Sequence, residues 1–260
     1  MEEKDLARSK DYVQSLGRGL AIMKIFSEEN PRLTLSEVAE LTGYTRATAR
    51  RFLLTLEALG YVGSTERHFF LKSQVLTLGY AYLSSFSLVS TAQMHLEELS
   101  ADLRESCSAS VLEGENVIYV CRVTANRIMT INLAVGTQLP AYCTSMGRVL
   151  LASMKPAEID SYFANAKLEK LTSKTVVEEA KLRTIIEDVR KNGYSIVSEE
   201  LEEGLESVSV PIHGKDGKVL AAANISAHAS RVSIDQLQNE FLPKLQKSVK
   251  GIEKALAMQS

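Results

Sequence analysis

A short run of hydroxyl and guanidinium side chains lies on one face of a predicted helix that follows Thr45. If Thr45 caps this helix, those side chains can reach phosphates and guanine edges in the major groove of DNA. They are Thr45, Arg46, Thr48, Arg50 and Arg51, with Ala47 on the same face. The same face would be an ordinary solvated surface on a structural helix pair, so the neighbouring elements decide between the two interpretations.

The residues before this helix predict a second helix and a sharp turn. Residues 35–41 are amphipathic and can be capped by Thr34 or Ser36, and Thr42-Gly43-Tyr44 is a three-residue turn. Its glycine can adopt the left-handed conformation that such a corner needs. The residues expected to face inward are Ala39, Gly43, Ala49 and Phe52. Residues 33–59 therefore have the pattern of a helix-turn-helix.

A predicted hairpin follows directly. Gly60 ends the helix, a strand opens at Val62, residues 64–68 form a polar turn, and residues 69–71 form the returning strand. The order helix, helix, hairpin is typical of a winged helix and favours DNA binding over a purely structural helix pair. Arg18 and Arg67 are further candidate DNA contacts.

Composition narrows the class of protein. The 260 residues suggest about two domains, and 45% hydrophobic and 24% charged residues are ordinary for a globular chain. No run approaches the ~20 apolar residues of a membrane span, and the charged N-terminus does not resemble a signal peptide, so we expect a cytoplasmic protein. The net charge of −2 excludes general coating of nucleic acid, so DNA affinity must come from locally placed arginines.

The sequence offers little support for catalysis or for a metal. The three cysteines form no Cys-x-x-Cys unit and the four histidines are scattered, so we expect reduced thiols, no metal and no cofactor. Ser145 lacks the Gly-x-Ser-x-Gly surroundings of a nucleophile elbow. An enzyme acting on a small carboxylate, fused to a DNA-binding module, is the alternative to a regulator, and a winged-helix protein adaptor is a third interpretation.

A helix is also predicted at Ser15–Phe26, before the helix-turn-helix. After the hairpin, a helix at 73–85 precedes a region in which strands are bracketed by helices. A further helix begins at Ser87 or Ser90. This order predicts an α+β fold whose second domain has an antiparallel sheet. The expected strands are 108–112, 117–122, 128–133, 194–197, 207–212 and 218–226, and the expected helices are 145–154, 157–163, 178–192 and 233–258.

Several polar groups in the second domain could line a pocket. A loop rich in small residues runs into a helix starting at Ser145 and Met146, and free amides at a helix start can bind a carboxylate or phosphate, although Thr144 or Ser145 could simply cap the helix. Residues two apart in a strand share a face, which pairs Ser207 with Ser209 and Asn224 with Ser226. An exposed sheet face is an equally good interpretation of those pairs.

Apolar walls for such a site could come from Met129, Ile131, Leu133 and Tyr142, which by default are core residues. The acidic run around Leu201 is expected to be solvated, although one of its members, such as Glu199, could line the pocket. Arg148, one turn into the helix, is expected to be a surface charge or a structural pair. Together these residues predict a concave site for a small organic anion with a flat or apolar body.

Three segments also carry a resemblance to a known family. Residues 12–20, the Arg46–Leu53 segment and above all residues 136–152 resemble IclR-type bacterial transcription regulators. The last segment is similar to the branch that controls β-ketoadipate-pathway genes, the PcaR, PcaU and PobR type.

The resemblance implies a winged helix-turn-helix domain (1–72), a linker helix (73–87) and a GAF/profilin-like effector-binding and oligomerisation domain (88–260). It implies homodimers or dimers of dimers on partly palindromic operators, contact with RNA polymerase in an activator, and control of aromatic catabolism. The effectors it implies are aromatic acids or ring-cleavage products such as 4-hydroxybenzoate, protocatechuate or β-ketoadipate.

By the same resemblance, the backbone amides of Ser145 and Met146 hold the effector's carboxylate, and Asn224 and Ser226 donate to it. A pocket aspartate of some members falls near Val197 and is absent here or replaced by Glu199. A pocket cysteine of some members falls near Ser207.

Overall fold

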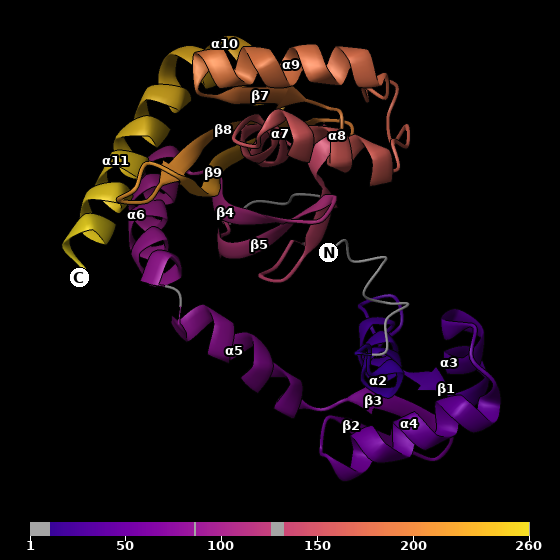
Figure 1. The fold of residues 1–260 in the computed structure, drawn as a ribbon. Helices are drawn as coiled ribbons and strands as arrows, with labels where there is room; N and C mark the ends of the chain where they lie inside the picture. Colours follow the sequence, from indigo (N-terminus) through magenta and orange to yellow (C-terminus); the bar gives the residue numbers. More distant parts are fainter. Residues whose placement is uncertain (1–10, 86, 126–132, 260) are drawn as a thin grey trace. The chain divides into compact units, whose positions relative to one another are not determined.

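The chain forms two compact units in a computed structural model that describes residues 11–85, 87–125 and 133–259 (Figure 1). The division lies between Tyr82 and Leu83, within the predicted linker of residues 73–87. A 3-10 turn (Ser73–Val75) leads into α5 (Leu76–Ser85), and α6 (Ser87–Leu103) follows. In the described ranges no single helix is long and apolar enough to cross a membrane; only the bent pair Ser73–Leu83 and Ser87–Leu103 has the length and composition when taken together.

The first unit is a winged helix-turn-helix, as the sequence predicts. It contains α2 (Gln14–Lys24), α3 (Leu35–Thr42) and α4 (Arg46–Ala58). Three short antiparallel strands pair in the order β1-β3-β2 and form the wing. They are β1 (Leu33–Thr34), β2 (Val62–Thr65) and β3 (His68–Leu71). The two-residue β1 was not predicted, because a strand this short has no recognisable periodicity.

Local capping explains why the two helices begin and end where they do. The Thr34 hydroxyl accepts from the Glu37 amide, and the Glu37 carboxylate accepts from the Thr34 amide at 2.7 Å, which lowers the pKa of Glu37. Gly43 ends α3 with φ of 69°, and the Thr45 hydroxyl accepts from the Thr48 amide at the start of α4. These bonds fix the corner between the helices.

The expected inward face was partly wrong. Ala39 and Ala49 are buried, but Gly43 is exposed and Phe52 is only half-buried. The buried stripe of α4 runs through Ala49, Leu53 and Leu56, which follow a helical spacing of four and three residues. Leu53 therefore takes the core position expected for Phe52.

The second unit contains a six-stranded sheet in the order β6-β5-β4-β9-β8-β7, with every neighbouring pair antiparallel. This confirms the α+β prediction. The predicted strand 128–133 lies almost entirely outside the described residues, and β6 was missed because it sits in a segment rich in small and loop-forming residues. The strands are β4 (Ser106–Glu113), β5 (Asn116–Val123), β6 (Gln138–Pro140), β7 (Ser195–Ser198), β8 (Leu205–His213) and β9 (Val219–His228).

Helices cover both faces of this sheet (Figure 1). On one face α6 and α11 (Leu242–Met258) pack over the alternate residues Ala221, Ala223 and Ile225 of β9. The other face carries α7 (Ser145–Ala152), α8 (Pro156–Asn165) and α9 (Glu179–Asn192). The predicted single helix 233–258 is instead interrupted. It begins with the short α10 (Ile234–Gln236), and a π-helical turn (Leu237–Phe241) separates α10 from α11. The turn lies just before Pro243, which has no amide hydrogen to donate.

All eight residues of α7 are buried. This is possible because the helix start lies directly against the preceding 3-10 turn (Ala141–Cys143). A Cβ atom on Gly147 would stand 2.1 Å from the Ala141 carbonyl oxygen and 2.4 Å from its Cα, far inside van der Waals contact. Only glycine fits at this position.

We therefore expect Gly147→Ala to destabilise the second unit by about 3 kcal/mol, at the upper end of overpacking costs, because backbone atoms rather than a flexible side chain must move. Thermal melting followed by circular dichroism measures the loss. The matched control is Gly79→Ala in α5, where an added Cβ meets nothing within 4 Å and helix propensity favours alanine. A Gly147→Ala protein that melts with the wild type would contradict the close-contact argument.

Candidate functional site

The outward face of α4 carries the arginines singled out from the sequence. Arg46, Arg50 and Arg51 are exposed, as are Thr45 and Ala47, while Thr48 is half-buried and hydrogen-bonded to Thr45. Within the described ranges none of the three arginines forms a salt bridge. Their guanidinium groups are therefore available to phosphates and base edges.

Arg18 belongs to the same surface, whereas Arg67 lies apart from it. Arg18, from α2, has its guanidinium carbon 5.6 Å from the centre of the Tyr44 ring, a cation–π contact that ties α2 to the helix-turn-helix corner. Together with Thr48 and Arg51 it lines one hollow between α2 and α4. Arg67 is exposed in the turn between β2 and β3, at the tip of the wing.

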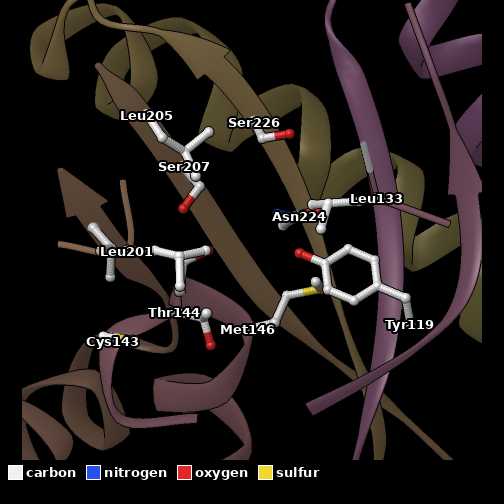
Figure 2. A pocket seen from close by; sticks show the side chains of 12 residues that line it. Tyr119, Leu133, Cys143, Thr144, Met146, Leu201, Leu205, Ser207, Asn224 and Ser226 are labelled. Atoms are coloured by element: carbon white, nitrogen blue, oxygen red, sulfur yellow. The ribbon is translucent and has the colours of Figure 1, made fainter. Parts of the chain in front are cut away.

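A cavity in the second unit brings together six of the predicted pocket residues (Figure 2). About 470 Å³ of the space around these residues is free of protein atoms, a figure that includes the open solvent at the mouth of the cavity. The predicted members are Ser145, Met146, Ser207, Asn224, Ser226 and the apolar wall Leu133, and the others are Tyr119, Cys143, Thr144, Val197, Leu201 and Leu205.

The start of α7 forms one side of the cavity. Thr144 caps the helix by accepting from the Gly147 amide at 3.2 Å, and the Arg148 amide begins the helical pattern by donating to the Thr144 carbonyl. Among the described residues the amides of Ser145 and Met146 have no acceptor. Two N–H groups at the positive end of a helix thus face a cavity, which favours an anion there.

The sheet supplies the opposite polar surface. Ser207 of β8 pairs with Ser226 of β9, and Ser209 pairs with Asn224. All four side chains are buried on the face that α7 covers, so the alternative of an exposed sheet face does not apply. Ser209 differs from the other three residues. Its hydroxyl donates to the Ala223 carbonyl at 2.8 Å, and it does not line the cavity.

Two of the polar atoms at the cavity lack a partner. Ser145 Oγ and Asn224 Oδ1 are buried and have no hydrogen bond to any described residue. Leaving a buried polar atom unsatisfied costs about 1–3 kcal/mol, and native proteins keep such atoms mainly where a ligand, ion or water satisfies them. Both side chains are more than nine-tenths buried and both line the cavity. This cavity therefore has the features of a ligand site.

Two more of the predicted pocket residues, Tyr142 and Glu199, do not line the cavity. Tyr142 lines a separate groove, and its hydroxyl donates to the Glu169 carbonyl and accepts from the Glu169 amide. Glu199 adopts φ of 56° in a tight turn, where its carboxylate pairs with Lys174 and accepts from the Gly204 amide, which lowers its pKa. These hydrogen bonds and the ion pair hold both side chains away from the cavity. Met129 and Ile131 lie outside the described residues.

Tyr119 and Cys143 reach the cavity although sequence reasoning did not select them. Tyr119 lies two residues after Val117 in β5 and shares its face, which packs against α7. Burial raises the pKa of Tyr119 and of Cys143 to about 12, so both walls are uncharged at neutral pH. Of the apolar walls, Leu201 lies within the acidic run and Leu205 follows it, and this spacing alone does not predict a pocket.

Arg148 is a structural pair, one of the two roles expected for it. Its guanidinium contacts the Glu200 carboxylate at 2.7 Å and donates from Nε to the Tyr142 carbonyl, and Glu200 also accepts from the Val176 amide. Because these buried charges satisfy each other, neither is left to attract a ligand. In the described part of the chain, no three His, Cys, Asp or Glu side chains gather as a metal site would require.

Both units match one family of known proteins. Residues 15–66 match the IclR helix-turn-helix domain, and residues 80–254 match the C-terminal domain of the bacterial transcriptional regulator IclR. The chain belongs to the IclR family. It is a DNA-binding transcriptional regulator rather than an enzyme, as the helix-turn-helix pattern and the resemblance predicted.

Individual relatives cover nearly the whole chain. The Pca regulon regulatory protein of Pseudomonas putida is 43% identical over 236 residues, which span 90% of this chain and 81% of that protein. A putative transcriptional regulator of Rhodococcus sp. RHA1 has a crystal structure that is 48% identical with a TM-score of 0.83, covering 96% of this chain and all of that one.

A second similar structure contains a ligand. It is the inducer-binding domain of a double mutant of the transcription factor PobR from Acinetobacter, in complex with 3-hydroxybenzoic acid. This structure is 28% identical with a TM-score of 0.61, and covers 64% of this chain and 97% of that one.

The Arg148–Glu200 pair leads to a stability prediction. Arg148→Met should cost about 3–5 kcal/mol, because it leaves the Glu200 carboxylate buried without a counter-ion. Adding Glu200→Gln should recover part of that loss, since the stranded charge is then removed. Urea unfolding monitored by circular dichroism measures both.

The control is Arg183→Met, whose ion pairs with Asp160 and Glu179 are largely exposed and worth no more than about 1 kcal/mol. Equal stability of Arg148→Met and Arg183→Met would rule out a structural role for the buried pair.

Proposed function

We propose that this IclR-family regulator senses a small organic anion in the cavity between α7 and the sheet, and that binding of the anion changes its affinity for operator DNA. The expected effectors are aromatic acids or products of aromatic ring cleavage, and the expected targets are genes of aromatic catabolism. The observation that carries the proposal is the convergence of two uncapped α7 amides with the unpartnered Ser145 Oγ and Asn224 Oδ1 on one cavity.

Each group has a role that its chemistry supports. The amides of Ser145 and Met146 bind the carboxylate at the positive end of α7. Asn224, Ser226 and Ser207 hydrogen-bond to the carboxylate or to other polar groups of the ligand. The uncharged walls, which include Tyr119 and Leu205, accept a flat or apolar body.

The relatives support this class of effector. One is named for the Pca regulon, and another was crystallised with 3-hydroxybenzoic acid in its inducer-binding domain. An aromatic acid suits the chemistry of a cavity that offers hydrogen-bond donors at one side and apolar walls around it.

On the DNA side, we propose that α4 enters the major groove. There the arginines of this helix, Arg46, Arg50 and Arg51, contact base edges or phosphates. Its small residues Thr45, Ala47 and Thr48 approach the DNA backbone. Further phosphate contacts come from Arg18 and Arg67. We further propose that residues 1–72 bind DNA, that 73–87 link the domains, and that 88–260 bind effector and form a cytoplasmic homodimer or dimer of dimers. If the regulator activates transcription, we expect it to contact RNA polymerase as well.

The effector prediction is a stabilisation that depends on Asn224. In a melting screen of aromatic and ring-cleavage acids, an effector at a hundredfold excess over its dissociation constant should add about 2.7 kcal/mol of stability. Asn224→Ala should abolish that shift. Without ligand, Asn224→Ala should lose less stability than a usual truncation of a buried side chain. The reason is that it also removes an unsatisfied buried acceptor, Oδ1.

Asn192→Ala, an exposed asparagine at the end of α9, is the control and should keep the full shift. If no acid in either class raises the melting temperature of the wild type, the sensing role is lost.

The DNA prediction concerns the arginines of α4. Arg50→Ala or Arg51→Ala should weaken binding to DNA from upstream of the regulator's own gene by about 1–3 kcal/mol, because each removes a base or phosphate contact. Fluorescence anisotropy over a range of salt concentrations measures the change, since phosphate contacts also set the salt dependence. Lys250→Ala, an exposed cation on α11, should bind as the wild type does. Unchanged affinity in both arginine variants would remove α4 from the interface.

A further inference from the structure

The cavity between α7 and the sheet is too narrow to hold an effector without rearrangement. The space inside it that is wide enough for a water molecule amounts to about 20 Å³, which is room for about one water. An aromatic acid is much larger than a water molecule, so part of the wall must move outward when such an acid binds. How firmly each wall is held indicates which part moves.

Most of the wall is firmly held. The sheet contributes residues of β5, β8 and β9, and each of these strands pairs with another strand on both sides, so moving one would break its hydrogen bonds. The start of α7 is held by the close contact of Gly147 with Ala141 and by the buried Arg148–Glu200 pair. Neither the sheet nor α7 can therefore move outward at low cost.

The turn between β7 and β8 is restrained much less. It places Leu201 on the cavity, where the side chain forms part of the apolar wall (Figure 2). The amides of Leu201, Glu202 and Glu203 donate to no described residue, and the next residue, Gly204, adopts the left-handed φ of 79°. A segment with so few hydrogen bonds opens more readily than the strands that it connects.

One side chain bridges the base of this turn. A Glu199 carboxylate oxygen accepts from the Gly204 amide at 3.0 Å, and the other oxygen pairs with Lys174 Nζ at 2.5 Å. The Lys174 side chain is 55% exposed, and an ion pair of this kind changes an equilibrium by no more than about fivefold. The turn is thus closed by contacts that are weak enough to break and form again.

We propose that residues 201–203 form a lid over the cavity, that Gly204 is its hinge, and that Glu199 is the latch that holds it closed. The other end of the lid is anchored at Glu200, which stays paired with Arg148. Opening breaks the bond between Glu199 and the Gly204 amide and withdraws Leu201, so that an effector can enter. The inference rests on the proposed function for what passes the lid, but the lid also opens without ligand.

Hydrogen exchange in the ligand-free intact chain measures the opening. The amides of Ser145 and Met146 are buried at the cavity and have no described acceptor, so they exchange when water enters past the lid. Mass spectrometry with residue-level fragmentation gives their rates, which should be slower than in an unstructured peptide. Lys174→Met should speed both about twofold to fivefold, because the latch loses its ion pair. Leu201→Ala should also speed both, because the lid loses the side chain that closes the cavity.

Two controls make the result specific. Lys181→Met breaks an exposed ion pair with Glu178 at the start of α9, and neither residue lines the cavity, so exchange at Ser145 and Met146 should keep the wild-type rate. The amides of β9, a strand paired on both sides, should exchange at the wild-type rate in every variant. That result shows that the fold is intact and that the change is confined to the lid.

Binding kinetics test whether ligand passes the lid. With 3-hydroxybenzoic acid as the probe, stopped-flow fluorescence should show that Lys174→Met raises the association and dissociation rate constants by similar factors. The affinity should stay within about twofold, because the same latch closes over the empty and the filled cavity. A change in the dissociation rate alone would show that the acid enters by another route, and would overturn the proposal.

The exchange outcomes separate the lid from the proposed function. Wild-type exchange as fast as in an unstructured peptide, or equal exchange in the wild type, Lys174→Met and Leu201→Ala, overturns the lid and leaves the sensing role standing. Failure of every acid to bind, with exchange still faster in both variants, confirms the opening and overturns the sensing role alone.

Discussion

The close approach of Gly147 to Ala141 is the constraint on which the second unit depends. It lets α7 lie buried between the sheet and the outer helices, and so directs the start of that helix toward the sheet instead of toward solvent. The Arg148–Glu200 pair, one residue later, ties the same helix to the loop after β7. A helix start held this rigidly can present its amides to a ligand without reorganising, and preorganisation of this kind reduces the entropic cost of binding.

The unpartnered polar atoms at the cavity lower the stability of the empty protein and are available to bind a ligand. Ser145 Oγ and Asn224 Oδ1 are both buried polar atoms without partners among the described residues, and each costs free energy in the empty protein. Other buried polar groups of the same unit, such as Ser209 and Tyr142, are satisfied by backbone groups. Ser145 and Asn224 line the cavity, whereas the unsatisfied Arg122 Nε, Tyr162 hydroxyl and Glu206 Oε2 belong to residues that do not. The two unsatisfied atoms at the cavity are positioned so that a bound anion or its polar groups could satisfy them.

Much of this architecture could be predicted from the sequence, for reasons that individual elements make clear. Thr34, Gly43 and Thr45 act locally, through caps and a left-handed turn, so the helix-turn-helix was recognisable from a few residues. Asn224 and Ser226 were placed by the two-residue period of a strand, which is also local. The place of Tyr119 in the cavity depends on the packing of α7 against the sheet, and the positions of Tyr142 and Glu199 depend on bonds to distant Glu169 and Lys174. Such long-range contacts leave no trace in residue spacing.

The burial of the three cysteines has a practical consequence. Desolvation raises the pKa of Cys107, Cys121 and Cys143 to about 12, so at pH 7 only about one thiol in 10⁵ is present as the thiolate that attacks electrophiles. Maleimide reagents would react with an engineered surface thiol long before they reached any of these. A fluorophore can therefore be attached at a single chosen position, for example on the wing, with the native cysteines left in place.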